Sequence, residues 1–451
     1  MSLVKNQEIE LQIESFTSEG SGVGHFDKMA VFVSGAAAGD RALVHIIKVK
    51  KTYAIGKAVK ILVPSADRIA SDCEVSSSCG GCAFRHIKYE AELEMKRSKV
   101  ENAFLRLGGI DKSVDEMIGA EELVGYRNKA EYPVGFDTGL KVGFYAAHTH
   151  RIVDCQHCVL QPEEFSNIVR IVRKWIIEYG ISVYDPETGR GIIRHIYIRQ
   201  GSVSKEIMVC LVINSDFLPK KEKLLERLLT ADNIKSVVIN INKEKTNVIL
   251  GRECKTIWGD DYIYDVLCGV KIRLSPLSFY QVNHAQAQRL YARAKEYAGL
   301  SGNETLLDMY CGAGTIGLST ADRCKRVIGV EIIEQAVSDA EVNAEINGIE
   351  NAEFYCADAA EAAQMLKSKG IRPEVIVLDP PRKGCDASLV ETVSKMSPDR
   401  VVYVSCDPAT LARDCKLFGE LGYKVEKLTA VDLFPRTVHV ETVCLLSKVQ
   451  K

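Results

Sequence analysis

The sequence contains no long hydrophobic run. In its 451 residues, no apolar stretch approaches the ~20 residues that a membrane span needs. The first residues, MSLVKNQEIELQIES, also lack the apolar core of a secretory signal. Repeats and low-complexity tracts are absent, and the net charge is only −2, which gives the whole chain no attraction for nucleic acid. We therefore expect a cytoplasmic protein with no membrane partner, in which any nucleic-acid contact uses a local basic face.

The composition is that of a globular protein, with one unusual feature. The chain is 46% hydrophobic and 26% charged, and its length suggests about two or three domains of roughly 150 residues each. Its fifteen cysteines are many for the cytosol, where disulfides are rare. Some of them should be metal ligands or catalytic thiols.

The pattern of apolar residues divides the chain into three predicted domains. Residues 1–62 hold short alternating segments (EIELQIESF, AVFVSG, RALVHIIKVK and AIGKAVKILV) between glycine-rich breaks such as EGSGVGHF, which predicts a small β-barrel. Residues 63–274 mix helices and strands, as an α+β domain does. From residue 275 strands alternate with helices, from TLLDMYCG to TVCLLSK, which predicts a doubly wound, parallel α/β sheet of Rossmann type.

A glycine loop follows the first strand of this α/β region. LLDMYCGAGTIGL places Gly312, Gly314 and Gly317 between a strand and a helix, where backbone N–H groups approach a ligand closely. Glu331 ends the next strand, where a carboxylate can accept hydrogen bonds from ribose hydroxyls. The pattern fits an NAD site and an S-adenosylmethionine site equally, and an ordinary strand–helix turn is the third interpretation.

A rigid acidic turn favours methyl transfer. Asp379-Pro380-Pro381 follows the strand VIVL, and the two prolines fix an extended turn that presents the carboxylate at the sheet edge. Such a group can hold the edge of a planar base. A D/N-P-P motif in this place resembles those of nucleic-acid methyltransferases, and dehydrogenases do not need one.

Cysteines mark two further places. In VVYVSCDPATLARD, Cys406 stands at the tip of a predicted buried strand, so it is either a nucleophile or another small core residue. Separately, SDCEVSSSCGGC and DCQHC bring together candidate metal ligands. Four thiolates suit zinc or an iron–sulfur cluster, and the spacing does not decide between them. These candidate ligands are Cys73, Cys79, Cys82, Cys155 and Cys158.

Several motifs together resemble the RNA uracil-5-methyltransferase family. SCDPATLARD, LDPPRKG, the Tyr-Cys-Gly form of the glycine loop, SFYQVN and HVETV occur in the order that the family shows. Its members methylate uridine in ribosomal or transfer RNA, and bacterial 23S rRNA enzymes among them carry an N-terminal TRAM barrel and a [4Fe–4S] site. The resemblance implies S-adenosylmethionine as cofactor, 23S rRNA as partner and no obligate protein partner.

The resemblance also implies roles for individual residues. Cys406 matches the nucleophile, Glu441 the base, and Asp379 the carboxylate that holds the uracil edge. The cluster ligands would be Cys73, Cys79, Cys82 and Cys158, with Cys155 as the alternative fourth ligand. The cofactor-contacting positions, taken with the glycine loop, are Gln281, Tyr310, Gly312, Gly314, Glu331, Asn343, Asp358 and Asp379.

The chemistry explains why a thiol and a base are both needed. Uracil C5 is a poor nucleophile, and thiolate attack on C6 builds enolate character at C5, which can then take a methyl group from a sulfonium. A base must afterwards remove the C5 proton so that the thiolate can leave.

RNA contacts and competing functions are predicted less directly. Arg127 and Lys129, or Arg190, Arg194 and Arg199, could form a basic wall beside the pocket, and solvated strand ends are the alternative. Lysines of the predicted barrel, Lys50 and Lys51 among Lys48, Lys57 and Lys60, are the better RNA candidates by resemblance to TRAM domains. The competing functions are a tRNA methyltransferase, an NAD-linked iron–sulfur oxidoreductase and a non-catalytic RNA-binding protein; intact Cys406 and Glu441 argue against the last two.

Overall fold

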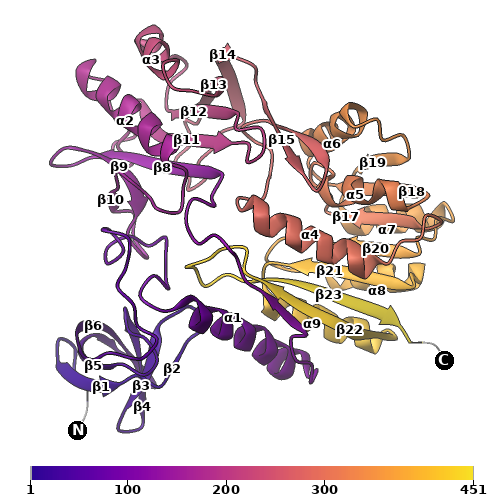
Figure 1. Cartoon of the computed structure of the whole chain (residues 1–451), viewed down its shortest axis with the longest axis horizontal. Coiled ribbons are helices and arrows are strands. Elements are labelled where there is room, and N and C mark those ends of the chain that lie inside the picture. Colours follow the sequence, from indigo (N-terminus) through magenta and orange to yellow (C-terminus); the bar gives the residue numbers. More distant parts are fainter. Residues whose placement is uncertain (1–2, 450–451) are drawn as a thin grey trace. The chain divides into compact units, whose positions relative to one another are not determined.

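The computed structural model of the chain describes residues 3–449, which form two compact units (Figure 1). The first unit takes the chain up to Lys99 together with Tyr145–Arg151 and Phe434–His439, and the second unit takes the remainder. Among the described residues, no helix has the length and apolar character needed to cross a bilayer.

The first unit is built on a six-stranded sheet. Its order is β1-β5-β6-β4-β3-β2, and Glu14 N–H donates to Val23 O, which draws the end of β1 towards β3. The predicted strand-rich domain is confirmed, and its closure into a barrel stays a prediction. The strands are β1 (Glu8–Gln12), β2 (Ser15–Phe16), β3 (Gly22–Phe26), β4 (Met29–Ser34), β5 (Arg41–Val49) and β6 (Tyr53–Val63).

One strand of this sheet was wrongly predicted as a break. The glycine-rich stretch EGSGVGHF contains β3, which pairs with β4 along its whole length. A Cβ on Gly24 would lie 2.4 Å from the carbonyl oxygen of Gln12, and one on Gly22 would lie 2.8 Å from Ile13. These glycines therefore allow two strands to approach closely, which is a known use of glycine inside strands.

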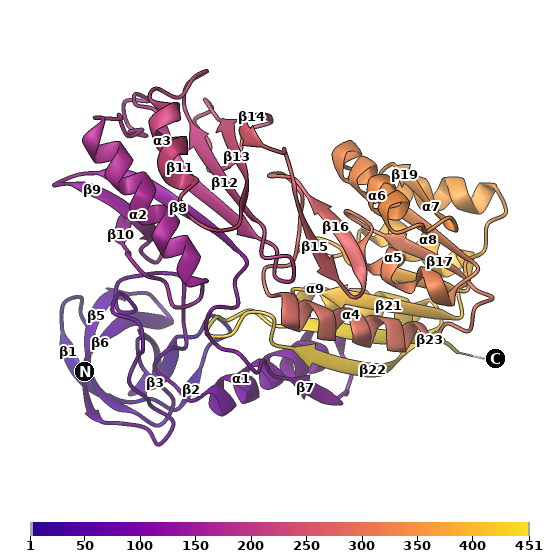
Figure 2. The same cartoon turned by 45° about the horizontal axis from the view of Figure 1, so that its top comes forward.

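The second unit contains a mixed seven-stranded sheet. Its order is β10-β9-β8-β11-β12-β13-β14, and α2 and α3 cover one face (Figure 2). The mixture of helices and strands predicted for this region is present, and β11 and β12 are buried on both faces. The elements are β8 (Lys129–Phe136), β9 (Leu140–Tyr145), β10 (Ile152–Asp154), α2 (Glu163–Glu178), β11 (Ile193–Gln200), β12 (Ile207–Ile213), α3 (Lys221–Leu228), β13 (Ile234–Ile241) and β14 (Glu253–Gly259).

The methyltransferase-type sheet has eight strands in the order β19-β18-β17-β20-β21-β23-β22-β7. Five neighbouring strands from β19 to β21 are parallel and alternate with helices, as predicted. The elements are β17 (Thr305–Met309), α5 (Thr315–Thr320), η2 (Ala321–Arg323), β18 (Arg326–Glu331), α6 (Glu334–Ile346), β19 (Ala352–Cys356), α7 (Ala359–Ser368), β20 (Val375–Leu378), α8 (Ala387–Met396), β21 (Arg400–Ser405), α9 (Pro408–Glu420), β22 (Tyr423–Val431) and β23 (Glu441–Lys448).

The expectation of an all-parallel sheet was wrong for its last strand. β23 pairs antiparallel with both β21 and β22. A parallel return needs a crossover of a dozen or more residues, usually a helix, and the chain between β22 and β23 contains none. In addition, β7 (Glu116–Ile118) pairs with β22, so a strand from the predicted central domain completes this sheet.

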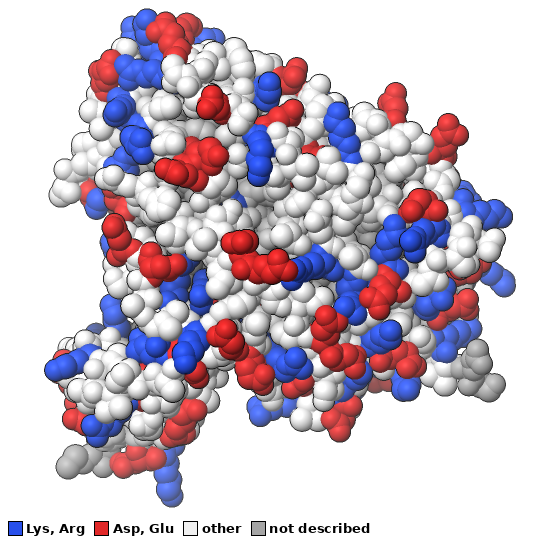
Figure 3. All heavy atoms as spheres, in the orientation of Figure 1, with Lys and Arg blue, Asp and Glu red and all other residues white. Residues whose placement is uncertain are grey.

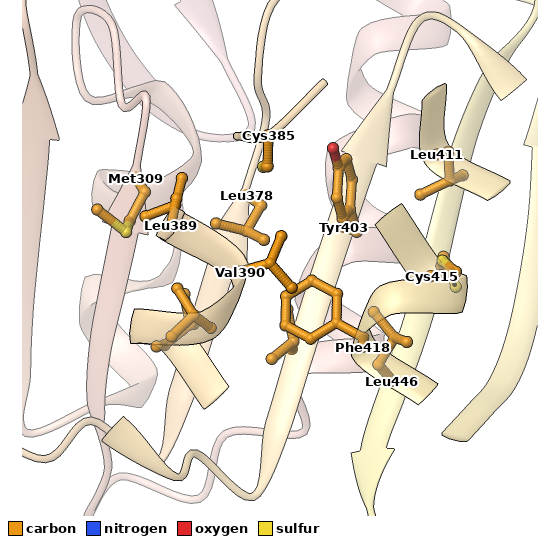
Figure 4. Packing of buried hydrophobic residues seen from close by; sticks show 14 of the residues in the cluster. Met309, Leu378, Cys385, Leu389, Val390, Tyr403, Leu411, Cys415, Phe418 and Leu446 are labelled. Carbon is orange, nitrogen blue, oxygen red and sulfur yellow. Dashed lines mark hydrogen bonds between the residues drawn. The ribbon is translucent and has the colours of Figure 1, made fainter. Parts of the chain in front are cut away.

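The remaining elements precede β17 in the sequence. They are α1 (Tyr89–Ala103), the π-helical turn η1 (Phe104–Gly108), β15 (Ile263–Leu267), β16 (Val270–Leu274) and α4 (His284–Ala298). On one face of the methyltransferase-type sheet, side chains of α8 and α9 pack against strand residues such as Leu378, Tyr403 and Leu446 (Figure 4). This packed layer fixes the strand ends that carry the candidate site.

Candidate active site

Three predicted catalytic residues lie at one edge of the eight-stranded sheet. β20 ends at Leu378 and β21 at Ser405, so Asp379 and Cys406 each follow the carboxyl end of a parallel strand. Glu441 is the first residue of β23, and the pairing of Ser405 with Thr442 places it beside that same end of β21. The antiparallel direction of β23, which the sequence did not predict, therefore brings Glu441 beside Cys406.

The charges of these residues act on one another. Burial raises the pKa of Asp379 to about 7. Burial and the charge of Asp379 raise the pKa of Glu441 to about 8. Burial and the carboxylates of Glu441 and Asp379 raise the pKa of Cys406 to about 11. The three groups thus share a small, desolvated site, as catalytic groups often do.

A fourth residue of the site was missed. Arg382 lies close enough to lower the pKa of both Cys406 and Glu441, against the burial and carboxylate charges that raise them. The sequence analysis used LDPPRKG only for its Asp-Pro-Pro turn. The signal was a cation three residues after that aspartate, in the same rigid turn.

The glycine loop has the predicted backbone geometry. Gly312 and Gly314 adopt positive φ angles of 55° and 81°, and Tyr310 also has a positive φ of 66°. A left-handed conformation is costly for a tyrosine, and such strain is concentrated at functional sites. Glu331 accepts hydrogen bonds from the N–H groups of Gly312 (3.1 Å) and Ile332 (2.8 Å), which fixes its carboxylate at the strand end.

Gln281 lies near Asp379 through a shared neighbour. The hydroxyl of the buried Tyr291 responds to the charge of Asp379 and to a hydrogen bond with Gln281; burial, the largest effect, holds its pKa well above the usual value. Asn128 Nδ2 also donates to the carbonyl oxygen of Gln281 at 3.0 Å. The segment SFYQVN therefore lies near the Asp-Pro-Pro turn, with Tyr291 as the shared neighbour.

Two predicted cofactor positions have partners within the protein. Asn343 is buried, donates to Ala313 O (3.0 Å) and accepts from Arg273 N–H (2.9 Å). It therefore supports the glycine loop through the backbone of Ala313. Asp358 is exposed and caps α7 by accepting from Ala360 N–H at 2.9 Å. A direct contact of either with the cofactor stays a prediction.

Asp308 is a further residue that the sequence analysis did not single out. It is fully buried at the end of β17, and its Oδ2 accepts from Gly317 N–H at 2.8 Å. Burial raises the pKa of Asp308 to about 7, and its Oδ1 has no hydrogen-bond partner among the described residues. Its place inside LLDMYCG was the available signal.

The candidate metal ligands are divided between the two units. Cys73, Cys79 and Cys82 lie in the first unit, close enough for one thiol's charge to raise the pKa of another, although burial raises it more. In the second unit, the buried Cys155 thiol lies 3.3 Å from His157 O, and Cys158 is half-buried. Within residues 3–449, no group of three or more His, Cys, Asp or Glu side chains is arranged to hold a metal ion.

The basic residues predicted to contact RNA differ in how exposed they are. Lys50 and Lys51 are exposed after β5, Arg127 is half-buried, and the half-buried Lys129 pairs with Glu131 at 3.1 Å. Basic and acidic side chains are interspersed over the face drawn in Figure 3. The suggested wall of Arg190, Arg194 and Arg199 was wrong for Arg194 and Arg199, because both are buried and donate to backbone carbonyls, and they are not solvated strand ends either. Arg190 is exposed.

Comparison with known proteins identifies the family. Residues 201–449 match the family described as tRNA (uracil-5-)-methyltransferase, and residues 4–59 match the TRAM domain. The chain belongs to the tRNA (uracil-5-)-methyltransferase family. It is therefore an S-adenosylmethionine-dependent RNA uracil methyltransferase.

Relatives of this uracil methyltransferase align along its whole length. An uncharacterized RNA methyltransferase of Clostridium tetani is 43% identical, with 98% of this chain and 97% of the relative covered. One of Halalkalibacterium halodurans is 44% identical, covering 98% and 97%. The crystal structure of Pyrococcus abyssi tRNA (uracil-54, C5)-methyltransferase in complex with S-adenosyl-L-homocysteine is similar with a TM-score of 0.79, at 29% identity, covering 97% of this chain and 100% of the other.

Proposed function

We propose that this methyltransferase acts on C5 of uridine in 23S rRNA through a covalent bond between Cys406 and uracil C6. The observation that supports the covalent step is the convergence of Cys406, Glu441 and Asp379 at one sheet edge, where both carboxylates raise the pKa of Cys406 and Asp379 also raises that of Glu441. An NAD-linked oxidoreductase would leave this arrangement without a role.

The residues would act in sequence on the target base. The base must leave its stack before Cys406 can reach C6. With a pKa of about 7, Asp379 is partly protonated at neutral pH and can donate to a uracil oxygen as enolate charge develops. After C5 is methylated, Glu441 takes the C5 proton, the 5,6 double bond re-forms and the thiolate leaves.

S-adenosylmethionine would supply a methyl group activated by a sulfonium, and residues around the glycine loop would hold it. Glu331 would accept from the ribose hydroxyls, as carboxylates at this strand end do. Ile332 follows it with 63% of its side chain exposed, beside the glycine loop, as expected for an apolar surface that an adenine ring covers. Gln281, Tyr310 and Asp379 would complete the site.

The first unit also has features that fit an iron–sulfur cluster. Arg85 is buried beside Cys82, and its Nε and Nη2 have no hydrogen-bond partner among the described residues. Buried donors without partners are costly, and the sulfides of an anionic cluster would accept from them. We propose a [4Fe–4S] cluster on Cys73, Cys79 and Cys82, which would order the cysteine loop; Cys158 as the fourth ligand stays a prediction.

A Cys406→Ala variant tests the covalent step. Methyl transfer to RNA should be lost, whereas the affinity for S-adenosylhomocysteine should stay near the wild-type value, because the glycine loop is separate. Cys356→Ala is the matched control, since Cys356 also ends a parallel strand of this sheet and should not affect turnover. Methylation by Cys406→Ala within tenfold of wild type would contradict the proposal.

Transfer RNA is the second candidate target, because the solved relative that covers the whole chain acts on uracil 54 of tRNA. Mapping 5-methyluridine in 23S rRNA and in tRNA from a strain that lacks the protein separates the two. Loss from 23S rRNA supports the proposal, and loss from tRNA alone assigns the second candidate.

A further inference from the structure

Two buried arginines of β11 each hold a loop. Arg199 is 2% exposed, and its Nη1 and Nη2 donate to the carbonyl oxygens of Ser275 (2.8 Å) and Ser278 (2.6 Å). Arg194 is 6% exposed, and its Nη1 donates to those of Asn242 (2.7 Å) and Glu244 (2.9 Å). The two side chains lie on the same strand, are buried to a similar extent and donate to backbone carbonyl oxygens, but they hold different loops.

The loop held by Arg199 includes one residue near Asp379 and one exposed aromatic residue. Residues 275–281 connect β16 to α4 and include Gln281, which shares the neighbour Tyr291 with Asp379. They also include Phe279, whose side chain is 73% exposed. Exposed aromatic rings in RNA enzymes stack on unpaired bases.

Other side chains hold the same segment near its middle and end. Ser278 Oγ donates to Asp339 Oδ2 at 2.9 Å, and Tyr280 Oη donates to Asp265 Oδ2 at 2.9 Å. Arg199 spans two carbonyls three residues apart and, together with the hydrogen bond from Ser275 N–H to Ser278 Oγ (2.9 Å), it fixes the shape of the turn that begins the segment. Its cross-strand partner on β8 is Lys129, one of the predicted RNA contacts.

We propose that Arg199 is a positioning residue for methyl transfer, holding the 275–281 segment so that Gln281 stays near Asp379 and Phe279 stays at the surface. The inference rests on the proposed function. A lysine in its place would offer one nitrogen atom where Arg199 uses two, Nη1 and Nη2, so it would not reproduce the geometry of this contact. A misplacement of about 1 Å in a catalytic site can lower the rate on the order of 10²-fold.

The test compares Arg199→Lys with its matched control, Arg194→Lys. Hydrogen–deuterium exchange should accelerate at residues 275–282 in the first variant and at residues 242–250 in the second. For Arg199→Lys, we expect kcat/KM for a uridine-containing RNA to fall about 10–100-fold and the Kd for S-adenosylhomocysteine to rise. Arg194→Lys should retain wild-type values of both.

The readouts separate the possible failures. Equal kinetic losses in the two variants, or wild-type constants in Arg199→Lys, would overturn the positioning role. If Arg199→Lys does not fold, Arg199→Gln, which keeps a single amide donor group, replaces it in the same comparison. A wild-type enzyme that transfers no methyl group to uridine would overturn the proposed function, and the exchange pattern with the S-adenosylhomocysteine affinities would still decide the role of Arg199.

Discussion

Asp379, Glu441 and Cys406 oppose one another's ionisation, because each lies in a desolvated place and two of them feel a neighbouring carboxylate. In the free enzyme at neutral pH, the thiol is therefore protonated and Glu441 is largely protonated. Arg382 is the cation that offsets this accumulation of negative charge. Catalysis needs the opposite charge states, so substrate and cofactor must help to create them.

Glu441→Gln should trap the reaction after methylation. The amide keeps the size of the side chain but cannot accept the C5 proton, so elimination stops, and a positioned base typically contributes about 10²–10⁴-fold. A protein–RNA band that carries methyl label and survives denaturing electrophoresis should accumulate, and it should vanish in Glu441→Gln combined with Cys406→Ala. Normal turnover, or inactivity without this band, would show that Glu441 is not the base; Glu391→Gln, at a surface pair with Lys395, is the control.

The thiol of Cys406 should be slow to react with iodoacetamide in the free enzyme. Its pKa of about 11 means that the thiolate fraction rises about tenfold per pH unit up to that value. Removing the neighbouring carboxylate in Glu441→Gln lowers that pKa and should speed alkylation at pH 8–9. Mass spectrometry of the peptide that contains Cys406 measures the rate, and an unchanged rate in Glu441→Gln would contradict the electrostatic coupling.

Among the elements, β3 depends on two glycines that allow close strand approach. Gly24→Ala would place a Cβ 2.4 Å from a backbone oxygen, and forcing extra atoms into a packed place costs about 1–3 kcal/mol. We expect a lower melting temperature by calorimetry. Gly419→Ala in α9, where a Cβ would meet no atom within 4 Å, is the control and should not lower it.

The strands and helices were predicted where one local pattern decides them. β21 and the glycine loop follow from an apolar run and glycine spacing, and Cys406 and Glu331 stand where those patterns place them. The antiparallel direction of β23 was not predictable from one local pattern. It depends on whether a helix connects β22 to β23, and the connection between them contains no helix. The burial of Arg199 was not predicted, because both faces of β11 are covered by other parts of the fold and the sequence of one strand does not show this.

For the whole molecule, we expect a specific content of iron and sulfide. Anaerobically purified protein should be brown and contain about four irons and four sulfides per chain. Cys82→Ser and Cys158→Ser should lose the colour and the iron, and Cys155→Ser should keep them. One zinc without sulfide would contradict the cluster, and the reverse behaviour of Cys155 and Cys158 would reassign the fourth ligand.

The short segment Phe434–His439 belongs to the first unit although it is among the last residues of the chain. Arg436 N–H donates to Glu92 Oε1 at 2.7 Å, and Ala83 N–H donates to Arg436 O at 2.8 Å. Likewise β7, near residue 117, finds its neighbour only in β22. During synthesis on the ribosome, Arg436 is made 344 residues after Glu92, so this contact cannot form before then. The early-made segments stay incomplete until their late partners appear, so a chain that stops before β22 would leave both of them without these contacts.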